Sequence, residues 1–159
     1  KQGGSYQRML ALRDFAEAVA EDDGADVILY DCPPGFTAAS CAALLAADEV
    51  IVPTLLDGFS LEGVVELDTQ ISNLRRVSPG IRIAGVLINQ WHRCPVVEQG
   101  EALLRDRGIP VFHTVIRRTD KVPESTFMRE AVLDYSATSA ASRDFRALAE
   151  ELFREASHG

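Results

Sequence analysis

The sequence has little of what marks several specialised protein classes. Its three cysteines show no C-x-x-C spacing, which excludes a disulfide-stapled scaffold and fits reduced thiols in a cytoplasm. No apolar run approaches the roughly 18 residues of a membrane span, so we expect no membrane segment. No basic stretch followed by an apolar one opens the chain, as it would in a signal peptide. The chain starts at Lys1 without a methionine, as a fragment of a longer protein would.

What is present is the composition of an ordinary globular domain. The 159 residues are 47% apolar and 25% charged, and this length suits one domain with a sizeable core. No internal repeat, low-complexity tract or long linker interrupts the chain, so we expect a single domain over residues 1–159.

The charge is acidic overall but unevenly spread. A net charge of −8 argues against general affinity for nucleic acid. Residues 65–121, however, carry a net charge of +3, against −8 for residues 1–64 and −3 for residues 122–159. This asymmetry permits an anion-binding face in the middle third, although solvated helix ends would give the same pattern.

Apolar periodicity predicts helices that alternate with strands. Helices are expected over 6–21, 37–47 (with Thr37 as N-cap), 60–77, 95–107, 123–131 and 139–156. Short apolar runs predict strands over 26–31, 49–53, 81–89 and 110–116. Strands separated by helices form right-handed βαβ units, so the fold class is α/β, with a mostly parallel sheet and helices on both faces.

Ligands of such folds bind at the carboxyl ends of the strands. In this sequence the loops at those ends span residues 31–35, 54–59, 89–93 and 116–121. A strand that ends in Asp31 suits a phosphate-and-magnesium site, because a carboxylate held there can accept from Mg²⁺-bound water or orient an attacking water. A helix-capping aspartate is the plainer alternative at this position.

Motifs in the first half of the chain resemble those of the ParA/MinD family, the deviant-Walker P-loop partition ATPases. Asp31-Cys-Pro-Pro34 resembles the family's D-x-P-P strand end. Ala47–Pro53 is similar to its A-D-x-V-I-x-P strand, and Ser60-Leu-Glu-Gly63 to its S-x-x-G helix start. Further matches follow in order: IRIAGVLINQW at 81–91, HTVIRRTDKVPES at 113–125 and AVLDYSATSAASRDFRALAEEL at 131–152. The resemblance implies a P-loop NTPase-like, three-layer α/β/α fold.

The resemblance also implies roles for individual residues, with ATP and Mg²⁺ as cofactors. Asp31 would be the catalytic carboxylate, acting on the attacking water and on magnesium through a metal-bound water. Pro34 and Gly35 would shape the loop that senses the γ-phosphate. Asn89 would read the adenine edge, since an amide can match the N6 donor and a neighbouring ring acceptor together. Arg118 would lie in the adenine-side loop.

The sequence departs from the family pattern at several points. Arg117 stands where the family usually has proline, and Trp91 after the Asn89 strand end could stack on a base or serve simple packing. The largest departure is the lack of a K-G-G-x-x-K-S/T loop, whose amides cradle phosphates; the two lysines are Lys1 and Lys121. The chain therefore resembles the carboxyl-terminal portion of such an ATPase, either truncated or naturally shortened, without the P-loop strand. We expect this chain alone to be inactive as an ATP hydrolase.

By this resemblance, the function is that of a ParA-like partition ATPase in plasmid or chromosome segregation. In the family, ATP closes a homodimer that binds DNA nonspecifically on the nucleoid, and a ParB-like centromere-binding protein stimulates hydrolysis. DNA contacts would come from the basic middle third: Arg75, Arg76, Arg105, Arg107 and Arg117. An ATPase-dead interaction domain that keeps the dimer, DNA or partner surfaces is an alternative. A MinD-like positioning ATPase is another, although residues 148–159 are acidic where a membrane anchor would be basic.

Other chemistries have weaker support in the sequence. His92 and Cys94 with a third ligand could bind zinc, although their spacing fits no common zinc site. Cys32 precedes a helix N-terminus and could be a nucleophile, although no histidine lies near it in the sequence.

Overall fold

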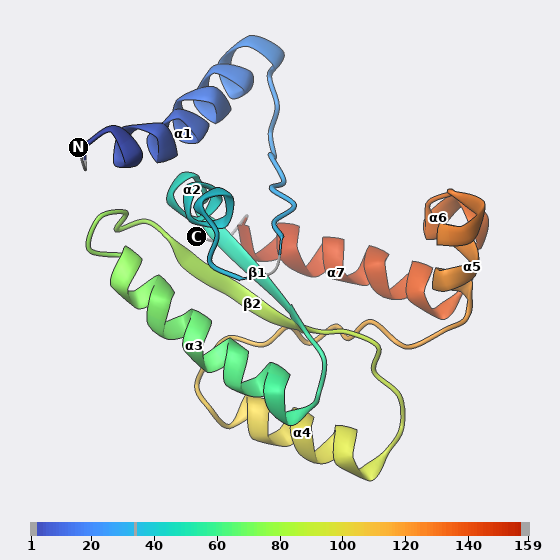
Figure 1. Cartoon of the computed structure of the whole chain (residues 1–159). Coiled ribbons are helices and arrows are strands. Elements are labelled where there is room, and N and C mark those ends of the chain that lie inside the picture. The colour runs from blue at the N-terminus through green and yellow to red at the C-terminus, as the bar shows by residue number, and fades with distance from the viewer. Residues whose placement is uncertain (1–2, 34, 157–159) are drawn as a thin grey trace. The chain divides into compact units, whose positions relative to one another are not determined.

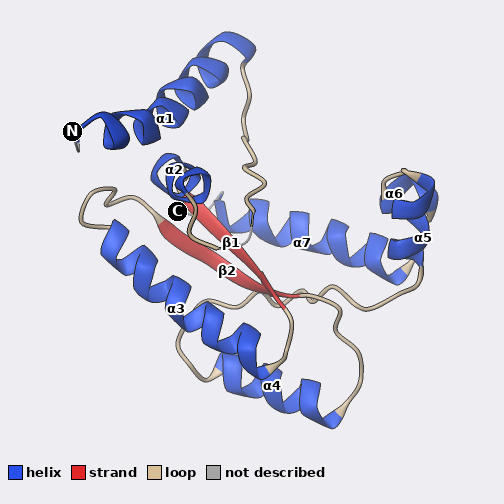
Figure 2. Ribbon diagram, viewed as in Figure 1, coloured by secondary structure: helices blue, strands red, loops and turns tan. Residues whose placement is uncertain are grey.

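The computed structural model describes residues 3–33 and 35–156. The chain divides into two compact units, one of residues 1–50 and 70–82 and the other of residues 51–69 and 83–159. The expectation of a single domain stays a prediction. Figures 1 and 2 show the elements in chain order: α1 (Gly3–Asp23), α2 (Ala38–Ala46), β1 (Glu49–Thr54), α3 (Gly58–Leu74), β2 (Arg82–Ile88), α4 (Pro95–Arg105), α5 (Lys121–Met128), α6 (Val132–Tyr135) and α7 (Ala140–Ala156).

The first unit contains α1 and α2, which pack against each other. The helix predicted over residues 6–21 forms as α1. α2 begins where Thr37 caps it, because the Thr37 Oγ1 accepts a hydrogen bond from the Ser40 amide at 3.1 Å. Ser40, Ala43 and Leu45 of α2 are buried, and Ser40 and Ala43, three residues apart, share one face of the helix. Both helices and the cap at Thr37 confirm the sequence pattern.

The strand predicted over residues 26–31 is wrong. Residues 24–33 form no helix or strand, Asp31 is exposed, and Val27 and Leu29 are 50% and 81% exposed. A strand exists only where its backbone pairs with a neighbour. Among the described residues, no backbone hydrogen bond joins residues 26–31 to a strand. An apolar run indicates that a segment can be buried, but it does not show whether a neighbouring strand is present to pair with it.

β1 and β2 form a two-stranded sheet that lies almost wholly in the second unit. The strands are parallel, because the Asn89 amide donates to the Thr54 carbonyl at 2.8 Å and the Arg82 amide donates to the Asp48 carbonyl at 3.0 Å. Their bounds lie close to the predicted 49–53 and 81–89. The helix α3 connects the two strands, which confirms the predicted βαβ unit.

A third segment runs beside β2 without forming a continuous strand. Val111 pairs in parallel with Val86 in an isolated bridge, and the Ile116 amide donates to the Ile88 carbonyl at 2.9 Å. The strand predicted over 110–116 therefore forms only in part. The reason is that the Thr114 amide, between these pairing points, bonds to a side chain of α7 instead of to β2.

The core of the second unit lies between this sheet and α7. Apolar side chains of β1, β2, the segment beside it and α7 form this core: Ile51, Ala84, Leu87, Phe112, Ile116, Phe145, Leu148 and Leu152. The α7 members recur at the spacing of one helix face. Figure 2 shows α7 on one side of the two strands and α4 on the other, so helices cover both faces of this sheet.

The helix predicted over residues 123–131 forms as α5, which starts earlier and ends earlier than predicted, and the short helix α6 follows outside the predicted range. α5 ends at Met128 because Arg129 takes a left-handed conformation, with φ of +57°, and the Glu130 amide donates back to the Ser125 carbonyl at 3.0 Å. Glycine usually holds such a position. Because an arginine holds it here, the composition gives no signal for the break.

Gly85 of β2 lies under the ring of Phe112. A Cβ atom at Gly85 would be 2.7 Å from two carbons of that buried ring. We therefore expect Gly85→Ala to lower the free energy of unfolding by about 1 to 3 kcal/mol, because the ring must shift within a packed core. Urea denaturation of the two proteins measures this difference.

Gly63 provides the matched control, since a Cβ atom there meets nothing within 4 Å in the exposed face of α3. We expect Gly63→Ala to leave stability unchanged or to raise it by up to about 1 kcal/mol, as alanine favours a helix. Equal stability of Gly85→Ala and the parent protein would contradict the packing of Phe112 on β2.

Candidate functional site

A pocket of about 150 Å³ lies in the second unit, at the carboxyl ends of β1 and β2. Residues of three loops and of α4 line it: Leu55, Leu56, Asp57, Asn89, Gln90, Trp91, His92, Val97 and Arg118. Three of the four loops predicted from the sequence therefore meet at one place. The fourth loop, residues 31–35, belongs to the first unit.

The loop that follows β1 is held at both of its sides. The Asp57 Oδ1 accepts a hydrogen bond from the Ser60 amide at 2.8 Å and so caps the first turn of α3. On the other side, α4 comes so close at Gly100 that a Cβ atom there would lie 3.3 Å from the Cβ of Leu56. One wall of the pocket is therefore fixed by two helices.

Asn89 follows β2 directly and lines the pocket. Its Oδ1 accepts a hydrogen bond from the Gln90 amide at 2.9 Å, and Gln90 takes a left-handed backbone conformation with φ of +53°. An amide oxygen has a second lone pair and the Nδ2 carries two protons, so the side chain can still offer an acceptor and a donor. This pair suits the edge of a purine with an exocyclic amine.

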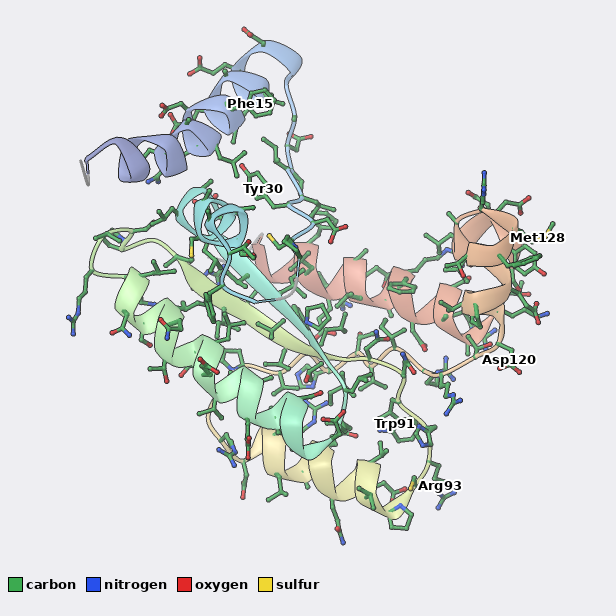
Figure 3. The ribbon with its side chains drawn as sticks, in the orientation of Figure 1. Phe15, Tyr30, Trp91, Arg93, Asp120 and Met128 are labelled. Atoms are coloured by element: carbon green, nitrogen blue, oxygen red, sulfur yellow. The ribbon has the colours of Figure 1, made fainter. Side chains whose placement is uncertain are left out.

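A chain of polar contacts from α4 fixes Trp91. The Trp91 Nε1 donates to Glu101 Oε2 at 2.9 Å, and the other oxygen, Oε1, accepts from the Arg105 Nε at 3.0 Å. Arg105 in turn donates from Nη2 to the Phe112 carbonyl at 3.1 Å. Figure 3 shows Trp91 and Arg93 on the loop from β2 to α4. The sequence does not predict this network; the four-residue spacing of Glu101 and Arg105 is its one visible signal.

Arg117 is bound to Asp144 of α7 through both its backbone and its side chain. The Arg117 amide donates to Asp144 Oδ2 at 2.9 Å, and the guanidinium donates to both carboxylate oxygens, at 2.6 Å from Nη2 to Oδ1 and 2.9 Å from Nε to Oδ2. Burial raises the pKa of Asp144, but the hydrogen bonds from Arg117 outweigh it and hold that pKa below its usual range. A proline at position 117 would lack the amide proton, so the arginine adds a backbone donor as well as a charge.

Glu151, two helical turns after Asp144 on α7, binds the same segment. It accepts hydrogen bonds from the His113 amide at 2.7 Å and the Thr114 amide at 2.9 Å. Burial raises the pKa of Glu151, but the hydrogen bonds from Thr114 and His113 hold it below its usual range. Together, Glu151 and Asp144 hold residues 113–117 on α7 and so place Arg118, which follows, at the pocket.

The ion pair between Arg117 and Asp144 should be measurable as stability. We expect Asp144→Asn to lower the free energy of unfolding by about 2 kcal/mol at neutral pH, because the remaining amide cannot hold the guanidinium as a carboxylate does. The folded-state pKa of Asp144 is depressed, so its contribution is complete above the unfolded pKa and is lost as the pH falls below about 4.

Urea titrations of both proteins across an acidic pH series measure this gap, which should close toward low pH. Arg118→Ala is the matched control, because the neighbouring guanidinium is exposed and should change stability by less than about 0.5 kcal/mol. A gap that stays constant from neutral to low pH would rule out the carboxylate charge as its cause.

The arginines predicted to contact DNA differ in their surroundings. Arg105 and Arg117 are ion-paired with carboxylates, at 2.9 Å and 2.6 Å. Arg75 is exposed, although its Nε donates to a backbone carbonyl at 3.0 Å, and Arg76 and Arg107 are exposed as well. Their roles in DNA binding stay predictions.

The residues predicted for magnesium and the γ-phosphate belong to the first unit. Asp31 is exposed, and Gly35 has φ of +87°, a conformation that glycine adopts without strain. Pro34 lies outside the described residues. The roles of all three stay predictions. In the part of the chain that the structure describes, no group of three or more His, Cys, Asp or Glu side chains is placed to hold a metal ion, so the zinc hypothesis for His92 and Cys94 gains no support.

Known proteins similar to this chain include two bacterial partitioning proteins. A family model described as an AAA domain matches residues 4–83. The chain is 34% identical over 134 residues to the chromosome-partitioning ATPase Soj of Thermus thermophilus, covering 82% of this chain and 54% of that protein. It is 32% identical over 153 residues to the chromosome partitioning protein ParA of Caulobacter vibrioides, covering 94% and 57%. The chain thus spans about half the length of the curated relatives it matches.

Solved structures with the same fold include two nucleotide-bound proteins. The septum site-determining protein MinD of Pyrococcus horikoshii, complexed with Mg-ADP, matches with a TM-score of 0.76 at 23% identity and covers 93% of this chain and 58% of that one. Cobyrinic acid a,c-diamide synthase of Mycobacterium smegmatis, with bound ADP and magnesium, matches with a TM-score of 0.76 at 24% identity and covers 94% and 55%. These likenesses show the fold, and they confirm the predicted parallel α/β class. The matching family model and the partitioning relatives show that the chain belongs to the ParA/MinD-type family of partition ATPases.

Proposed function

We propose that this chain serves in a ParA-like partition ATPase, which couples ATP hydrolysis to plasmid or chromosome segregation. One observation carries the proposal: three loops predicted to form a ligand site meet at a single pocket, and that pocket includes Asn89 and Arg118. Both residues match family positions on the adenine side. The names of the relatives from Thermus thermophilus and Caulobacter vibrioides support the same function.

The pocket has the donor set that a purine nucleotide needs. Leu55, Leu56 and Val97 supply apolar contact, Asn89 supplies an edge donor and acceptor, and Arg118 supplies an exposed cation. ATP with Mg²⁺ is the proposed cofactor, and bound Mg²⁺ supplies neutralisation of the phosphate charge. Asp31 is the proposed catalytic carboxylate, which would orient the attacking water and accept from metal-bound water, and Pro34 and Gly35 would shape the loop that senses the γ-phosphate.

The proposed assembly is a homodimer that binds duplex DNA without sequence preference, in the cytoplasm and on the nucleoid. A ParB-like centromere-binding protein is the proposed partner that stimulates hydrolysis. The net charge of +3 over residues 65–121 supports an anion-binding face on an otherwise acidic chain. No helix among residues 3–33 and 35–156 has the length and apolar character needed to cross a membrane.

The test of the base site uses the chain joined at its N-terminus to the complete N-terminal portion of a family member, which contains the P-loop strand and the K-G-G-x-x-K-S/T loop; we call this the extended protein. Asn89→Ala should weaken ATP binding about fivefold to tenfold, the cost of one lost hydrogen bond. Binding of inorganic tripolyphosphate should not change, because the amide contacts only the base. Titration calorimetry measures both ligands.

Asn73→Ala, at an exposed position of α3, is the control and should bind ATP like the parent. Unchanged ATP affinity in Asn89→Ala would remove this pocket from nucleotide binding. An extended protein that binds ATP but releases no phosphate would favour the alternative, an ATPase-dead interaction domain. A MinD-like positioning ATPase is a further alternative, for which the likeness to MinD supports the fold alone.

Nonspecific DNA binding should depend on the paired arginines at the end of α3. In the ATP-bound extended protein, Arg75→Ala with Arg76→Ala should weaken duplex binding and flatten the salt dependence of log K by up to about two units, since each neutralised phosphate releases counterions. Fluorescence anisotropy across a salt series measures both quantities. Arg13→Ala, in the acidic first 64 residues, should leave the slope unchanged. If the double variant keeps the parent slope, Arg75 and Arg76 are only a solvated helix end.

A further inference from the structure

We propose that the Trp91 indole is the stacking wall for the nucleotide base and that Glu101 of α4 is the residue that positions it. This inference rests on the proposed function and deepens it. It adds a base-contacting side chain to the pocket and a residue outside the pocket lining that acts through it. The ligand class is a planar heteroaromatic ring, for which the adenine of ATP is the proposed occupant.

The backbone of Trp91 is held from both sides. Its amide donates to the Ile116 carbonyl at 2.9 Å, and its carbonyl accepts from the Arg118 amide at 2.9 Å. These bonds form the parallel bridge between Trp91 and Arg117. Because Arg117 is itself clamped by Asp144, the residue that carries the indole is fixed relative to α7 as well as to β2.

The indole ring is held in one orientation by the bond from its Nε1 to Glu101. Glu101 is only partly exposed, at 24% for its side chain, and its second oxygen is occupied by Arg105 at 2.9 Å. Arg105 is anchored in turn on the Phe112 carbonyl at 3.1 Å. Because Arg105 holds the Glu101 carboxylate in place, the carboxylate does not move with the indole. Glu101 therefore fixes the orientation of the ring.

The contents of the pocket favour stacking over simple packing. Trp91 lines the pocket and is partly exposed, so some of its ring surface is open to a ligand. Asn89 lies two residues earlier on the same loop and also lines the pocket. An aromatic face beside an amide edge is the arrangement that binds a flat base, through stacking on one surface and hydrogen bonds at its rim.

The first measurement uses the 159-residue chain and adenosine, which needs no phosphate cradle. Trp91 is the single tryptophan, so its fluorescence reports this site alone. We expect saturable quenching by adenosine with a dissociation constant on the order of 1 mM, as for a small fragment in a shallow pocket. No saturable quenching by adenosine would overturn the proposal.

The second measurement compares variants by saturation-transfer NMR of the adenosine ring protons. Trp91→Ala should weaken binding about tenfold or more, and Trp91→Phe, which keeps an aromatic face, should stay within about threefold of the parent. Glu101→Ala should weaken binding in the same direction, and Glu101→Gln, whose amide oxygen can still accept from the indole, should restore most of it. Leu103→Ala, at a 60% exposed position of α4, is the control and should have no effect.

The results of these measurements show separately whether the stacking proposal fails and whether the proposed ATPase function fails. If Trp91→Ala binds adenosine like the parent while the extended protein hydrolyses ATP, the stacking wall is wrong and the ATPase stands. If Trp91 governs adenosine binding but the extended protein releases no phosphate, the base pocket stands and the hydrolase does not. If Glu101→Gln behaves like Glu101→Ala although both remain folded by circular dichroism, Glu101 has no positioning role.

Discussion

Replacing Asp31 with alanine in the extended protein should lower the rate of ATP hydrolysis by about a hundredfold or more. The carboxylate is proposed to orient the attacking water and to accept from metal-bound water, and such a group contributes about 10² to 10⁴ in rate. ATP binding should change by less than about threefold, because the base and the phosphate cradle are untouched. Phosphate release at saturating ATP measures the rate, and calorimetry measures the affinity.

Asp26 offers a matched control for Asp31. It is also exposed and lies in the same irregular stretch between α1 and α2, so Asp26→Ala changes the local charge equally. We expect this variant to hydrolyse ATP like the parent. Unchanged turnover in Asp31→Ala would take Asp31 out of the mechanism, and an equal loss in both variants would point to the charge of the segment.

The second large effect is on ATP affinity itself. We expect the 159-residue chain to bind ATP with Mg²⁺ only at millimolar concentrations or not at all, and the extended protein to bind at least about a hundredfold more tightly. The reason is that the amides and lysines of a P-loop supply most of the contacts to the phosphates. The chain has two lysines and no K-G-G-x-x-K-S/T loop. Calorimetry on both proteins measures the difference.

Adenosine controls for damage to the pocket, since it should bind both proteins alike. Micromolar affinity of the 159-residue chain for ATP would contradict this prediction. Such a result would mean that groups other than a P-loop hold the phosphates in this protein.

Local sequence signals predicted one helix cap, whose contacts are close in the chain, and two strands that a single connecting helix brings together. The Thr37 cap and the strands β1 and β2 formed where the pattern placed them. The segment 26–31 did not form a strand, because strand formation depends on a partner that an apolar run does not encode. At 110–116 the competing bonds came from Glu151, far away in sequence, and the ladder with β2 broke.

The candidate site was likewise predicted in part from the sequence and depends in part on contacts that the sequence does not show. A general rule for parallel sheets located three loops of the pocket, because those loops follow the strands directly. The supports of the pocket escaped prediction, since Asp144 and Glu101 act across the fold on Arg117 and Trp91. Charged residues on a helix usually face solvent, and only the bonds to Arg117 and Trp91 in the structure distinguish these two.

The fold alone does not separate a partition ATPase from other nucleotide-binding proteins, since the cobyrinic acid a,c-diamide synthase of Mycobacterium smegmatis shares it with a TM-score of 0.76. The most direct test of the proposed function is therefore the anisotropy of a random-sequence duplex titrated with the extended protein, in ATP with Mg²⁺ and in ADP with Mg²⁺. We predict binding at least about tenfold tighter in ATP, with a steep dependence on salt and no dependence on sequence. Equal binding in the two nucleotides, or no binding in either, would contradict the assignment of this chain to ATP-driven DNA partition.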